Sequence, residues 1–256
     1  MNKKGLTERD ICSKFINPAL KSSGWDLRTQ IREEVTFTDG RVIVQGSLHS
    51  RGKAKRADYI LYYKANMPIA IIEAKDNKHN VGDGMQQALE YSEILDIPFV
   101  FTSNGDSFVF HDKTIQDGPI EREISLEQFP TPDELREKYN TYKNLDNPEL
   151  IEIAEQDYFS DDSGMSPRYY QQIAVNRTVE AVAKGIDRIL LVMATGTGKT
   201  YTAFNIIWRL WKSKKKQRIL FLADRSALLT QTKNGDFSPF GNDVMHIIKN
   251  RKIDKS

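Results

Sequence analysis

An aspartate, a glutamate and a lysine fall on two neighbouring β-rich runs of this sequence, where they could share one metal ion. The runs 58–63 and 69–72 are close enough to pair as a hairpin. Glu73 and Lys75 are two positions apart and project from one strand face, while Asp58 comes alongside from the other strand. Two converging carboxylates repel each other unless a cation lies between them, and hard oxygen ligands suit Mg²⁺. We predict that Asp58 and Glu73 bind Mg²⁺ and that Lys75 orients or deprotonates an attacking water, which is chemistry suited to phosphate esters.

A Glu-x-Lys pattern on a strand is more often part of a solvated face, and two further features favour a site. The run Ile69-Ala-Ile-Ile72 is of the buried type, so the charged residues follow a core strand. The predicted helix 83–95 carries Gln87 and Tyr91 four positions apart, on one face. By itself this pair would as readily be an exposed Gln and a core Tyr. The candidate catalytic residues are Asp58, Glu73, Lys75, Gln87 and Tyr91.

The segment Leu190-Leu-Val-Met-Ala-Thr-Gly-Thr-Gly-Lys-Thr200 has the pattern of a phosphate-binding loop. Gly196 and Gly198 allow backbone N–H groups to surround an anion at the start of a helix, where the helix dipole favours negative charge. Lys199 would reach the β- and γ-phosphates of a nucleotide, and Thr200 would offer its hydroxyl to Mg²⁺. Met193 stands where the usual pattern has its first glycine. A Gly-rich turn without function is the alternative.

The form of this loop resembles superfamily 2 helicases and translocases, and the segments around it agree with that resemblance. Pro167-Arg-Tyr-Tyr-Gln-Gln-Ile-Ala174 looks like their adenine-recognising Q motif, in which Gln171 would bond to the base. Residues 219–231 look like motif Ia, which contacts the DNA backbone in that superfamily. The predicted cofactor-binding residues are Gln171, Thr195, Gly196, Thr197, Gly198, Lys199 and Thr200.

The elements expected to position these residues alternate between helices and strands. Thr7 reads as the N-cap of a helix that Gly24 ends, and a strand follows the turn pair Asp39-Gly40. Glu33 or Glu34, expected on an early helix, could add a carboxylate to the metal site but suits a solvated helix end better. A second strand pair, 98–102 and 107–110, completes a compact α/β core.

The sequence of the second half of the chain predicts a second structural unit, different from this core. Prolines and acidic residues between 129 and 166 indicate a helical linker, after which strand 188–193, a helix from Lys199 and strand 218–223 follow in βαβ order. We predict three parts, which are a nuclease domain 1–128, a helical and acidic linker 129–166, and an incomplete motor lobe 167–256.

Composition narrows the class of protein. The chain has 256 residues, 37 Lys and Arg against 35 Asp and Glu, and a formal net charge of +2, so any contact with nucleic acid must be local. The single cysteine, Cys12, excludes an internal disulfide framework and fits a reducing cytoplasm. No apolar run approaches the length of a membrane span, so we expect a cytoplasmic protein without membrane contact.

The metal-site pattern resembles PD-(D/E)xK nucleases, and the chain resembles the N-terminal part of the restriction (R, motor) subunit of type I restriction-modification enzymes. Besides the motor segments, the residues that carry this resemblance are Thr7-Glu-Arg-Asp10, Ala57-Asp58-Tyr59, Ile72-Glu-Ala-Lys75, Gly84-Met-Gln-Gln-Ala-Leu-Glu-Tyr91 and Ser103-Asn-Gly-Asp106. The resemblance implies a restriction-endonuclease-like mixed sheet flanked by helices, followed by an incomplete RecA-like parallel-sheet domain. It also implies Mg²⁺ and ATP as cofactors, and double-stranded DNA and methyltransferase and specificity subunits as partners, with the DNA target read by another subunit.

Two other functions remain open at this stage. The chain could belong to a solitary helicase-nuclease fusion of another restriction or repair system, or it could be a non-catalytic fragment that binds DNA or partner subunits. No Asp-Glu pair follows Thr200, so the acidic helicase motif is expected outside these residues. We therefore expect the 256 residues alone to turn over ATP poorly.

Overall fold

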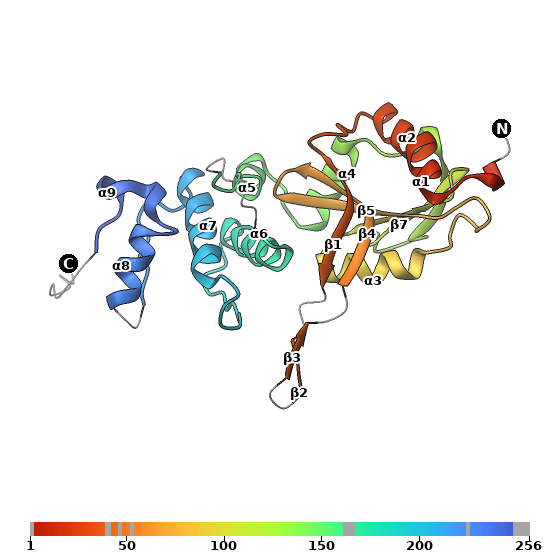
Figure 1. The fold of residues 1–256 in the computed structure, drawn as a ribbon. Coiled ribbons are helices and arrows are strands. Elements are labelled where there is room, and N and C mark those ends of the chain that lie inside the picture. The colour runs from red at the N-terminus through yellow and green to blue at the C-terminus, as the bar shows by residue number, and fades with distance from the viewer. Residues whose placement is uncertain are drawn as a thin grey trace.

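The computed structural model describes residues 3–38, 42–45, 48–51, 54–160, 167–223 and 226–247. The chain is an α/β protein, in which a six-stranded sheet with helices on both faces precedes a helical second part (Figure 1). No helix in these ranges is long and apolar enough to cross a membrane.

The six-stranded sheet has the order β1-β4-β5-β6-β7-β8. Its strands are β1 Ile31–Thr38, β4 Ala54–Lys64, β5 Met67–Ala74, β6 Phe99–Ser103, β7 Ser107–Asp112 and β8 Glu121–Ser125. All neighbouring strands pair antiparallel except β5 and β6, which are parallel and are joined by helix α3, Met85–Leu95. The sheet is therefore mixed, as expected, and the two predicted strand pairs are confirmed.

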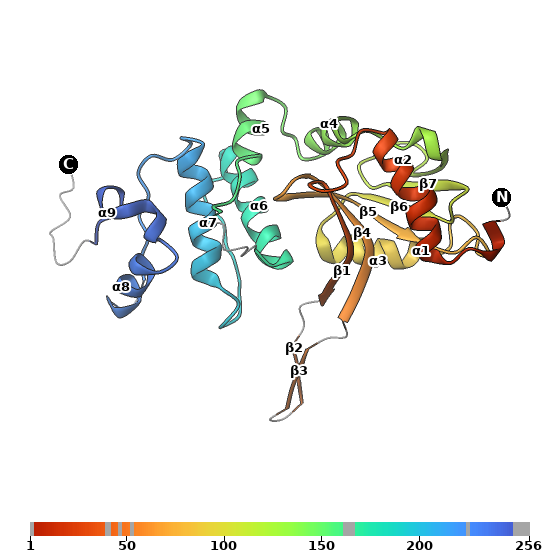
Figure 2. The same ribbon diagram turned by 45° about the horizontal axis from the view of Figure 1, so that its top comes forward.

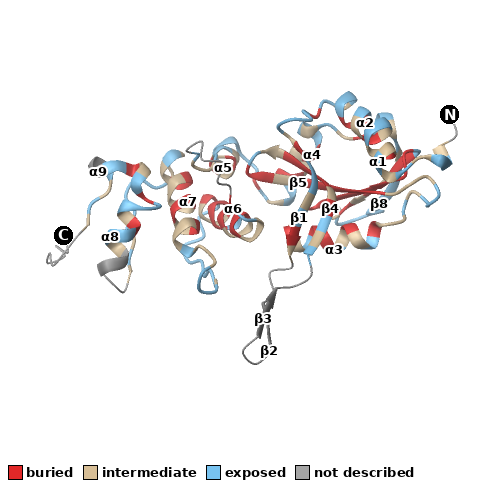
Figure 3. Cartoon of the chain, viewed as in Figure 1, coloured by how far each residue is buried: buried red, intermediate tan, exposed pale blue. Residues whose placement is uncertain are grey.

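The central strands are buried on both faces (Figure 3). Along β4, Tyr59 and Leu61 belong to one apolar core, and Ile60 and Tyr62 belong to the other. The first core lies under the N-terminal helices, and the second lies under α3 (Figure 2). This alternation follows from the two-residue period of a strand.

The N-terminal helix forms as expected but in three segments. They are α1 Glu8–Ile11, a π-helical turn Cys12–Ile16 and α2 Asn17–Ser22. Thr7 caps α1 through a capping box with Asp10. Pro18 has no N–H to donate within the helix, which gives a local reason for the irregular turn before it. Gly24, with φ +88°, follows α2.

Strand β1 was not predicted, and the prediction that Glu33 and Glu34 lie on an early helix is wrong. Both residues lie in β1, which pairs with β4 from Ile31 to Thr38. The pairing with β4 makes this segment a strand, because it gives β1 a hydrogen-bonded neighbour along most of its length. Strand β8 was also missed. The predicted turn at Asp39-Gly40 lies outside the described residues.

Beyond β1, the strand expected near 41–45 is confirmed as β2, Val42–Gln45, which pairs antiparallel with β3, Leu48–Arg51. These two strands form a separate two-stranded sheet. It projects from the body of the protein between β1 and β4 (Figures 1 and 2).

The region expected to be a linker is helical over α4 Pro132–Tyr142 and α5 Pro148–Ala154. Phe129, Leu135 and Tyr139 are buried in the first core of the six-stranded sheet. Helix α4 therefore packs as part of that first unit. Residues 161–166 of the expected linker lie outside the described residues.

The second unit consists of α6 Tyr169–Ala183, α7 Lys199–Lys212, α8 Ser226–Asn234 and α9 Gly241–Val244, with a 3-10 turn, Ser238–Phe240. The predicted strands 188–193 and 218–223 are not formed, and the described residues contain no second large sheet. Leu190 and Val192 are 86% and 88% exposed. A strand needs a hydrogen-bonded neighbour, and neither segment has one here. Asp224 and Arg225 of the predicted motif Ia lie outside the described residues.

Candidate active site

Asp58 and Glu73 are brought together by the register of β4 against β5. Tyr59 pairs with Ile72, so Asp58 and Glu73 stand opposite each other one position further along. An oxygen of Asp58, Oδ2, accepts a hydrogen bond of 2.8 Å from the backbone N–H of Ala74. The predicted meeting of the two carboxylates therefore agrees with the strand pairing.

Glu73 is the centre of this cluster and is 2% exposed. Its Oε1 accepts hydrogen bonds from Lys75 Nζ, at 3.1 Å, and from Gln87 Nε2. Its Oε2 is buried and has no hydrogen-bond partner among the described residues. A buried carboxylate oxygen without a partner is costly in a protein interior. A bound cation would satisfy it.

The charges of the cluster shift one another's protonation. Burial, and next the nearby Asp58, raise the pKa of Glu73 to about 7. Burial also raises the pKa of Asp58, although the bond from Ala74 N–H opposes the rise. Burial by itself lowers the pKa of Lys75, but the attraction and hydrogen bond of Glu73, together with the charges of Glu8 and Asp58, outweigh it, and the pKa lies above its usual value. Without a metal ion, Lys75 is therefore a cationic donor.

Glu8, at the start of α1, is an acidic neighbour of this cluster that sequence reasoning missed. Its side chain is half-buried, and burial followed by repulsion from Asp58 raises its pKa. The only sequence signal for such a role was the position of Glu8 directly after the N-cap Thr7. An acidic residue at this position is also common in the first turn of an ordinary helix. No three Asp, Glu, His or Cys side chains in the described part of the chain are arranged to hold a metal ion. The pair Asp58 and Glu73 remains the candidate ligand set.

The side chains of Gln87 and Tyr91 contact different residues. Gln87 contacts Glu73, whereas Tyr91 is 9% exposed and packs edge-on against Phe37 of β1, with ring centroids 5.2 Å apart. Lys55 Nζ lies 5.8 Å from the centre of the Tyr91 ring. Helix α3 therefore brings one residue of the predicted motif to the carboxylates and packs the other between α3 and β1.

The loop after the candidate strand carries Lys78 and His79. Both lie in the turn 76–79, and His79 Nδ1 is 2.9 Å from Asp76 Oδ1. The backbone N–H of Lys75 bonds to Ser103 O at 2.9 Å, and Asn104 Nδ2 bonds to His79 O. The β6–β7 turn thus holds this loop beside the candidate site.

Gly84 lets α3 approach the carboxylates, and its replacement by alanine is expected to destabilise the site. Its φ is +98°, and a Cβ there would lie 3.0 Å from Lys75 Cε and 3.3 Å from Glu73 Cγ. The left-handed backbone alone costs an alanine about 1–2 kcal/mol. We expect Gly84→Ala to lower the free energy of unfolding by at least that amount, measured by urea denaturation.

Gly82→Ala is the matched control for this prediction. A Cβ at Gly82 would meet only Val109 Cγ2 at 3.9 Å, an ordinary contact. This variant should stay within about 0.5 kcal/mol of the original chain. Equal stability of the two variants would show that Gly84 does not limit the approach of α3.

The phosphate loop has the backbone that its sequence predicts. Gly196 and Gly198 both have left-handed φ values, +78° and +81°, and Gly198 is the N-cap of α7. Lys199 Nζ reaches back across the loop to Ala194 O at 3.2 Å, and Thr197 Oγ1 donates to the same oxygen at 2.6 Å. The loop thus has glycines, a lysine and a helix N-terminus suited to a phosphate group.

Gln171 lies against this loop from α6. Its Nε2 donates to Thr197 O at 2.9 Å, and its Oε1 accepts from the backbone N–H of Arg168. A Cβ on Gly198 would lie 2.3 Å from Gln171 Nε2, so only glycine fits there without movement. Both ends of the Gln171 amide are therefore bonded to backbone in this state, and base recognition would require it to exchange these bonds.

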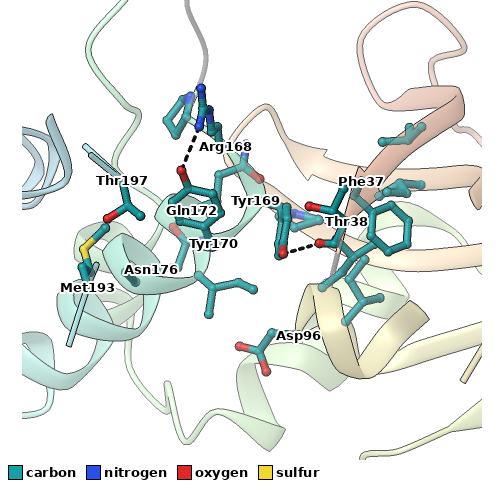
Figure 4. Close-up of a pocket in the computed structure, with 18 of the residues that line it drawn as sticks. Phe37, Thr38, Asp96, Arg168, Tyr169, Tyr170, Gln172, Asn176, Met193 and Thr197 are labelled. Atoms are coloured by element: carbon teal, nitrogen blue, oxygen red, sulfur yellow. Dashed lines mark hydrogen bonds between the residues drawn. The ribbon is translucent and has the colours of Figure 1, made fainter. Parts of the chain in front are cut away.

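A cavity of about 920 Å³ separates the first unit from α6 and the phosphate loop. Figure 4 shows Phe37, Thr38 and Asp96 on one side and Tyr169, Gln172 and Thr197 on the other. The two sides touch at the cavity edge, where the Tyr169 hydroxyl donates to Thr38 O. Arg177 of α6 also bonds to both carboxylate oxygens of Asp96, at 2.9 Å each. The cavity has room for a nucleotide-sized ligand next to the loop.

Comparison with known proteins places both units in restriction systems. Residues 28–125 match the family described as Type I restriction enzyme R protein N terminus. Residues 164–256 match the family described as Type III restriction enzyme, res subunit.

Individual relatives agree with these matches. The endonuclease subunit of the type I restriction enzyme EcoAI of Escherichia coli is 55% identical, over 99% of this chain and 31% of that protein. The EcoKI endonuclease subunit of Escherichia coli strain K12 is 31% identical, over 67% of this chain and 18% of that protein. This chain thus spans less than a third of the length of either relative.

A solved structure is also similar. It is a fragment of a chain described as an HsdR subunit of a type I restriction enzyme from Vibrio vulnificus YJ016. The two share 43% sequence identity with a TM-score of 0.70, over 82% of this chain and 39% of that chain.

Proposed function

This chain belongs to the R subunits of type I restriction enzymes, as their N-terminal part, and from this premise we propose that its first unit hydrolyses phosphodiester bonds of double-stranded DNA. The observation that carries the proposal is the buried, unpartnered Oε2 of Glu73 beside Asp58 and Lys75. Such an oxygen is suited to Mg²⁺, and the lysine next to it is suited to the phosphate or the attacking water.

Each residue of the cluster has a distinct part in the proposed reaction. Asp58 and Glu73 would hold Mg²⁺, which supplies Lewis-acid stabilisation of the charge that develops on the phosphate. Gln87 orients the Glu73 carboxylate through its hydrogen bond to Oε1. Lys75, held at 3.1 Å from Glu73 Oε1, donates a hydrogen bond to the attacking water or to a phosphate oxygen. Tyr91 supports the site indirectly by packing α3 onto β1.

The second unit is proposed to bind ATP through its phosphate loop. Residues 195–198 would surround the phosphates with backbone N–H groups, Lys199 would contact the β- and γ-phosphates, and the Thr200 hydroxyl would face Mg²⁺. Gln171 would contact the adenine once it leaves Thr197 O. In the whole R subunit, this nucleotide would drive DNA translocation.

The remaining parts of the proposal concern the setting of the chain. The division into residues 1–128, 129–166 and 167–256 is proposed as nuclease domain, linker and motor start, with α4 packed on the nuclease core. Methyltransferase and specificity subunits are the proposed partners, and the cytoplasm is the proposed location.

A nicking assay tests the proposed reaction directly. The 256-residue chain is incubated with supercoiled plasmid and Mg²⁺, alongside an Asp58→Ala variant. We expect slow Mg²⁺-dependent nicking by the original chain and a loss of about 100-fold or more in the variant, since one of two metal ligands is gone. Equal nicking by both would contradict the assignment. DNA binding without nicking by either would favour a non-catalytic fragment.

A further inference from the structure

We propose that residues 76–81 form a DNA-contact loop of the candidate nuclease site, in which Lys78 binds a phosphate near the bond that is cut. Thr102 and Asn104 are the proposed positioning residues, because they hold the backbone of this loop in place. This inference rests on the proposed DNA cleavage and adds a substrate contact that the catalytic residues do not include.

The 76–81 loop lies directly beside the catalytic cluster. It follows Lys75, whose Nζ is 3.1 Å from Glu73 Oε1, and it leads to Gly84, where a Cβ would lie 3.0 Å from Lys75 Cε. Both ends of the segment between β5 and α3 are therefore at the cluster. Figures 1 and 2 show this segment at the end of the molecule that carries the N-terminus, away from the second unit.

Two buried side chains, one on β6 and one in the turn after it, hold the backbone of this loop. Thr102 is 0% exposed, and its Oγ1 donates to Val81 O at 2.7 Å. Asn104 is 5% exposed, and its Nδ2 donates to His79 O at 2.8 Å. Thr102 pairs in register with Glu73, so its side chain is on the same face of the sheet as the catalytic carboxylate. These buried polar groups therefore fix the loop relative to Glu73.

Side chains of the loop itself add further hydrogen bonds. Asn77 Nδ2 donates to Asn104 O at 3.0 Å. Asp76 Oδ1 accepts from the backbone N–H of Lys78 at 2.9 Å, and it lies 2.9 Å from His79 Nδ1. A loop that is already held in one shape loses less conformational entropy when it binds a ligand.

Lys78 is the cation that this loop presents to a ligand. Its side chain is exposed, and it forms no ion pair with any residue in the described part of the chain. Three other lysines of the first unit are paired with acids, in the pairs Lys3–Asp106, Lys55–Glu90 and Lys75–Glu73. Since an unpaired lysine gives up no ion pair when it binds a phosphate, Lys78 is suited to such a contact.

The position of Lys78 suits a phosphate close to the cleaved bond. Lys78 is three residues after Lys75, so their Cα atoms are at most about 11 Å apart. Phosphates of one DNA strand follow each other at about 3.4 Å along the helix axis. A strand bound at Glu73 therefore has one of its next few phosphates within reach of the Lys78 ammonium group.

A salt titration of DNA binding tests the contact. Binding of the 256-residue chain to a duplex of about 30 base pairs is measured by fluorescence anisotropy in EDTA over a range of salt concentrations. One phosphate contact corresponds to about 0.9 in the slope of log affinity against log salt. We expect Lys78→Ala to lower the slope by about that amount, and to lower the affinity near 100 mM salt by about 5-fold to 10-fold. Lys21→Ala, which removes an exposed lysine on α2, should leave both unchanged.

Neutral substitutions test the positioning residues. Thr102→Val replaces the hydroxyl that binds Val81 O with a methyl group, and Asn104→Ala removes the side chain that binds His79 O. Neither changes the charge of the protein, yet each should lower the salt slope by about 0.9, because Lys78 no longer meets its phosphate. Thr102→Ser keeps the hydroxyl and should keep the original slope. Adding Lys78→Ala to Thr102→Val or Asn104→Ala should cause no further fall.

Two results would overturn the proposal. One is an unchanged slope in Lys78→Ala, or an equal fall in Lys21→Ala. The other is the original slope in both Thr102→Val and Asn104→Ala. If a buried substitution prevents folding, which circular dichroism detects, Lys78→Ala still decides the case, because it changes only an exposed side chain.

The outcome is separable from that of the proposed nuclease function. Binding is measured without divalent ions, so it does not depend on catalysis. If Asp58→Ala nicks DNA as the original chain does while Lys78→Ala has the lower slope, the loop contact stands and the catalytic assignment falls. If Asp58→Ala loses nicking while Lys78→Ala keeps the original slope, the catalytic assignment stands and the loop contact falls.

Discussion

Replacing Glu73 with glutamine is expected to lower Mg²⁺-dependent DNA cleavage by about 10³-fold or more, because the substitution removes a charged metal ligand from a buried site. Glutamine has nearly the same size, and its oxygen can still accept from Gln87 and Lys75, so the fold should persist. The measurement is the cleavage rate of the R subunit assembled with its partner subunits, with ATP turnover followed in parallel. ATP turnover should stay within about 2-fold, since the phosphate loop lies in another unit of the fold.

The Glu73→Gln variant should also lose the pH dependence of Mg²⁺ binding that we expect of the original protein. In the metal-free protein the pKa of Glu73 is about 7, above its ordinary value of 4.5, chiefly through burial. The folded state therefore holds this proton more tightly than the unfolded state, and stability is lost as the pH rises from 4.5 through 7. Mg²⁺ requires the carboxylate, so its affinity should fall about 10-fold for each pH unit below the pKa. The rise in Tm on adding Mg²⁺ should be larger at about pH 8 than at about pH 6.

Glu93→Gln is the control for both measurements. Glu93 is exposed on α3, the helix that carries Gln87, and its replacement makes the same change from glutamate to glutamine. It should cleave DNA and respond to Mg²⁺ as the original protein does. Normal cleavage by Glu73→Gln, or a Mg²⁺ response that does not depend on pH in the original chain, would remove Glu73 from the metal site.

Replacing Lys199 with alanine is expected to weaken ATP binding by about 100-fold or more. Lys199 Nζ lies across the phosphate loop, 3.2 Å from Ala194 O, and is the only lysine among residues 190–200. A hydrogen bond to a charged group contributes about 1.5–3 kcal/mol, and two such bonds to phosphate oxygens correspond to a factor of 10² or more. The dissociation constant of a fluorescent ATP analogue is measured with the 256-residue chain and with the whole R subunit.

Lys184→Ala serves as the matched control for the loop. Lys184 is an exposed lysine at the C-terminal end of α6, in the same unit, and its loss should leave nucleotide affinity unchanged. Unchanged affinity in Lys199→Ala would mean that the loop does not hold the phosphates. DNA cleavage chemistry on nicked or short substrates should be unaffected by either variant.

Much of the fold around the candidate site could be predicted from local patterns. The hairpin that carries Asp58 and Glu73, the helix that carries Gln87, and the left-handed glycines of the phosphate loop follow from residue spacing and turn chemistry. These features depend on neighbours in sequence, so a single sequence contains their signal. Strand β1 was missed because its pairing partner, β4, is distant in sequence, and pairing rather than local preference makes Glu33 and Glu34 part of a sheet.

The strands expected at 188–193 and 218–223 have a local sequence signal but do not form in the structure. Their apolar, β-branched composition is a local signal for strands, but a strand also needs hydrogen-bonded neighbours, and the described residues offer none. Leu190 and Val192 are consequently exposed. Composition alone could not reveal whether such neighbours exist.

The amino-acid sequence by itself determined which residues have suitable chemistry: two acids and a lysine on or next to two paired strands, and a glycine-rich loop before a helix. Only the tertiary structure decided how these residues meet. It buried Glu73 with one oxygen unpartnered, brought Glu8 near Asp58, and sent Gln87 to the carboxylates while packing Tyr91 against Phe37. The physical reason is that burial and electrostatic repulsion depend on groups far apart in the chain, which take their positions only when the sheet and its helices pack together.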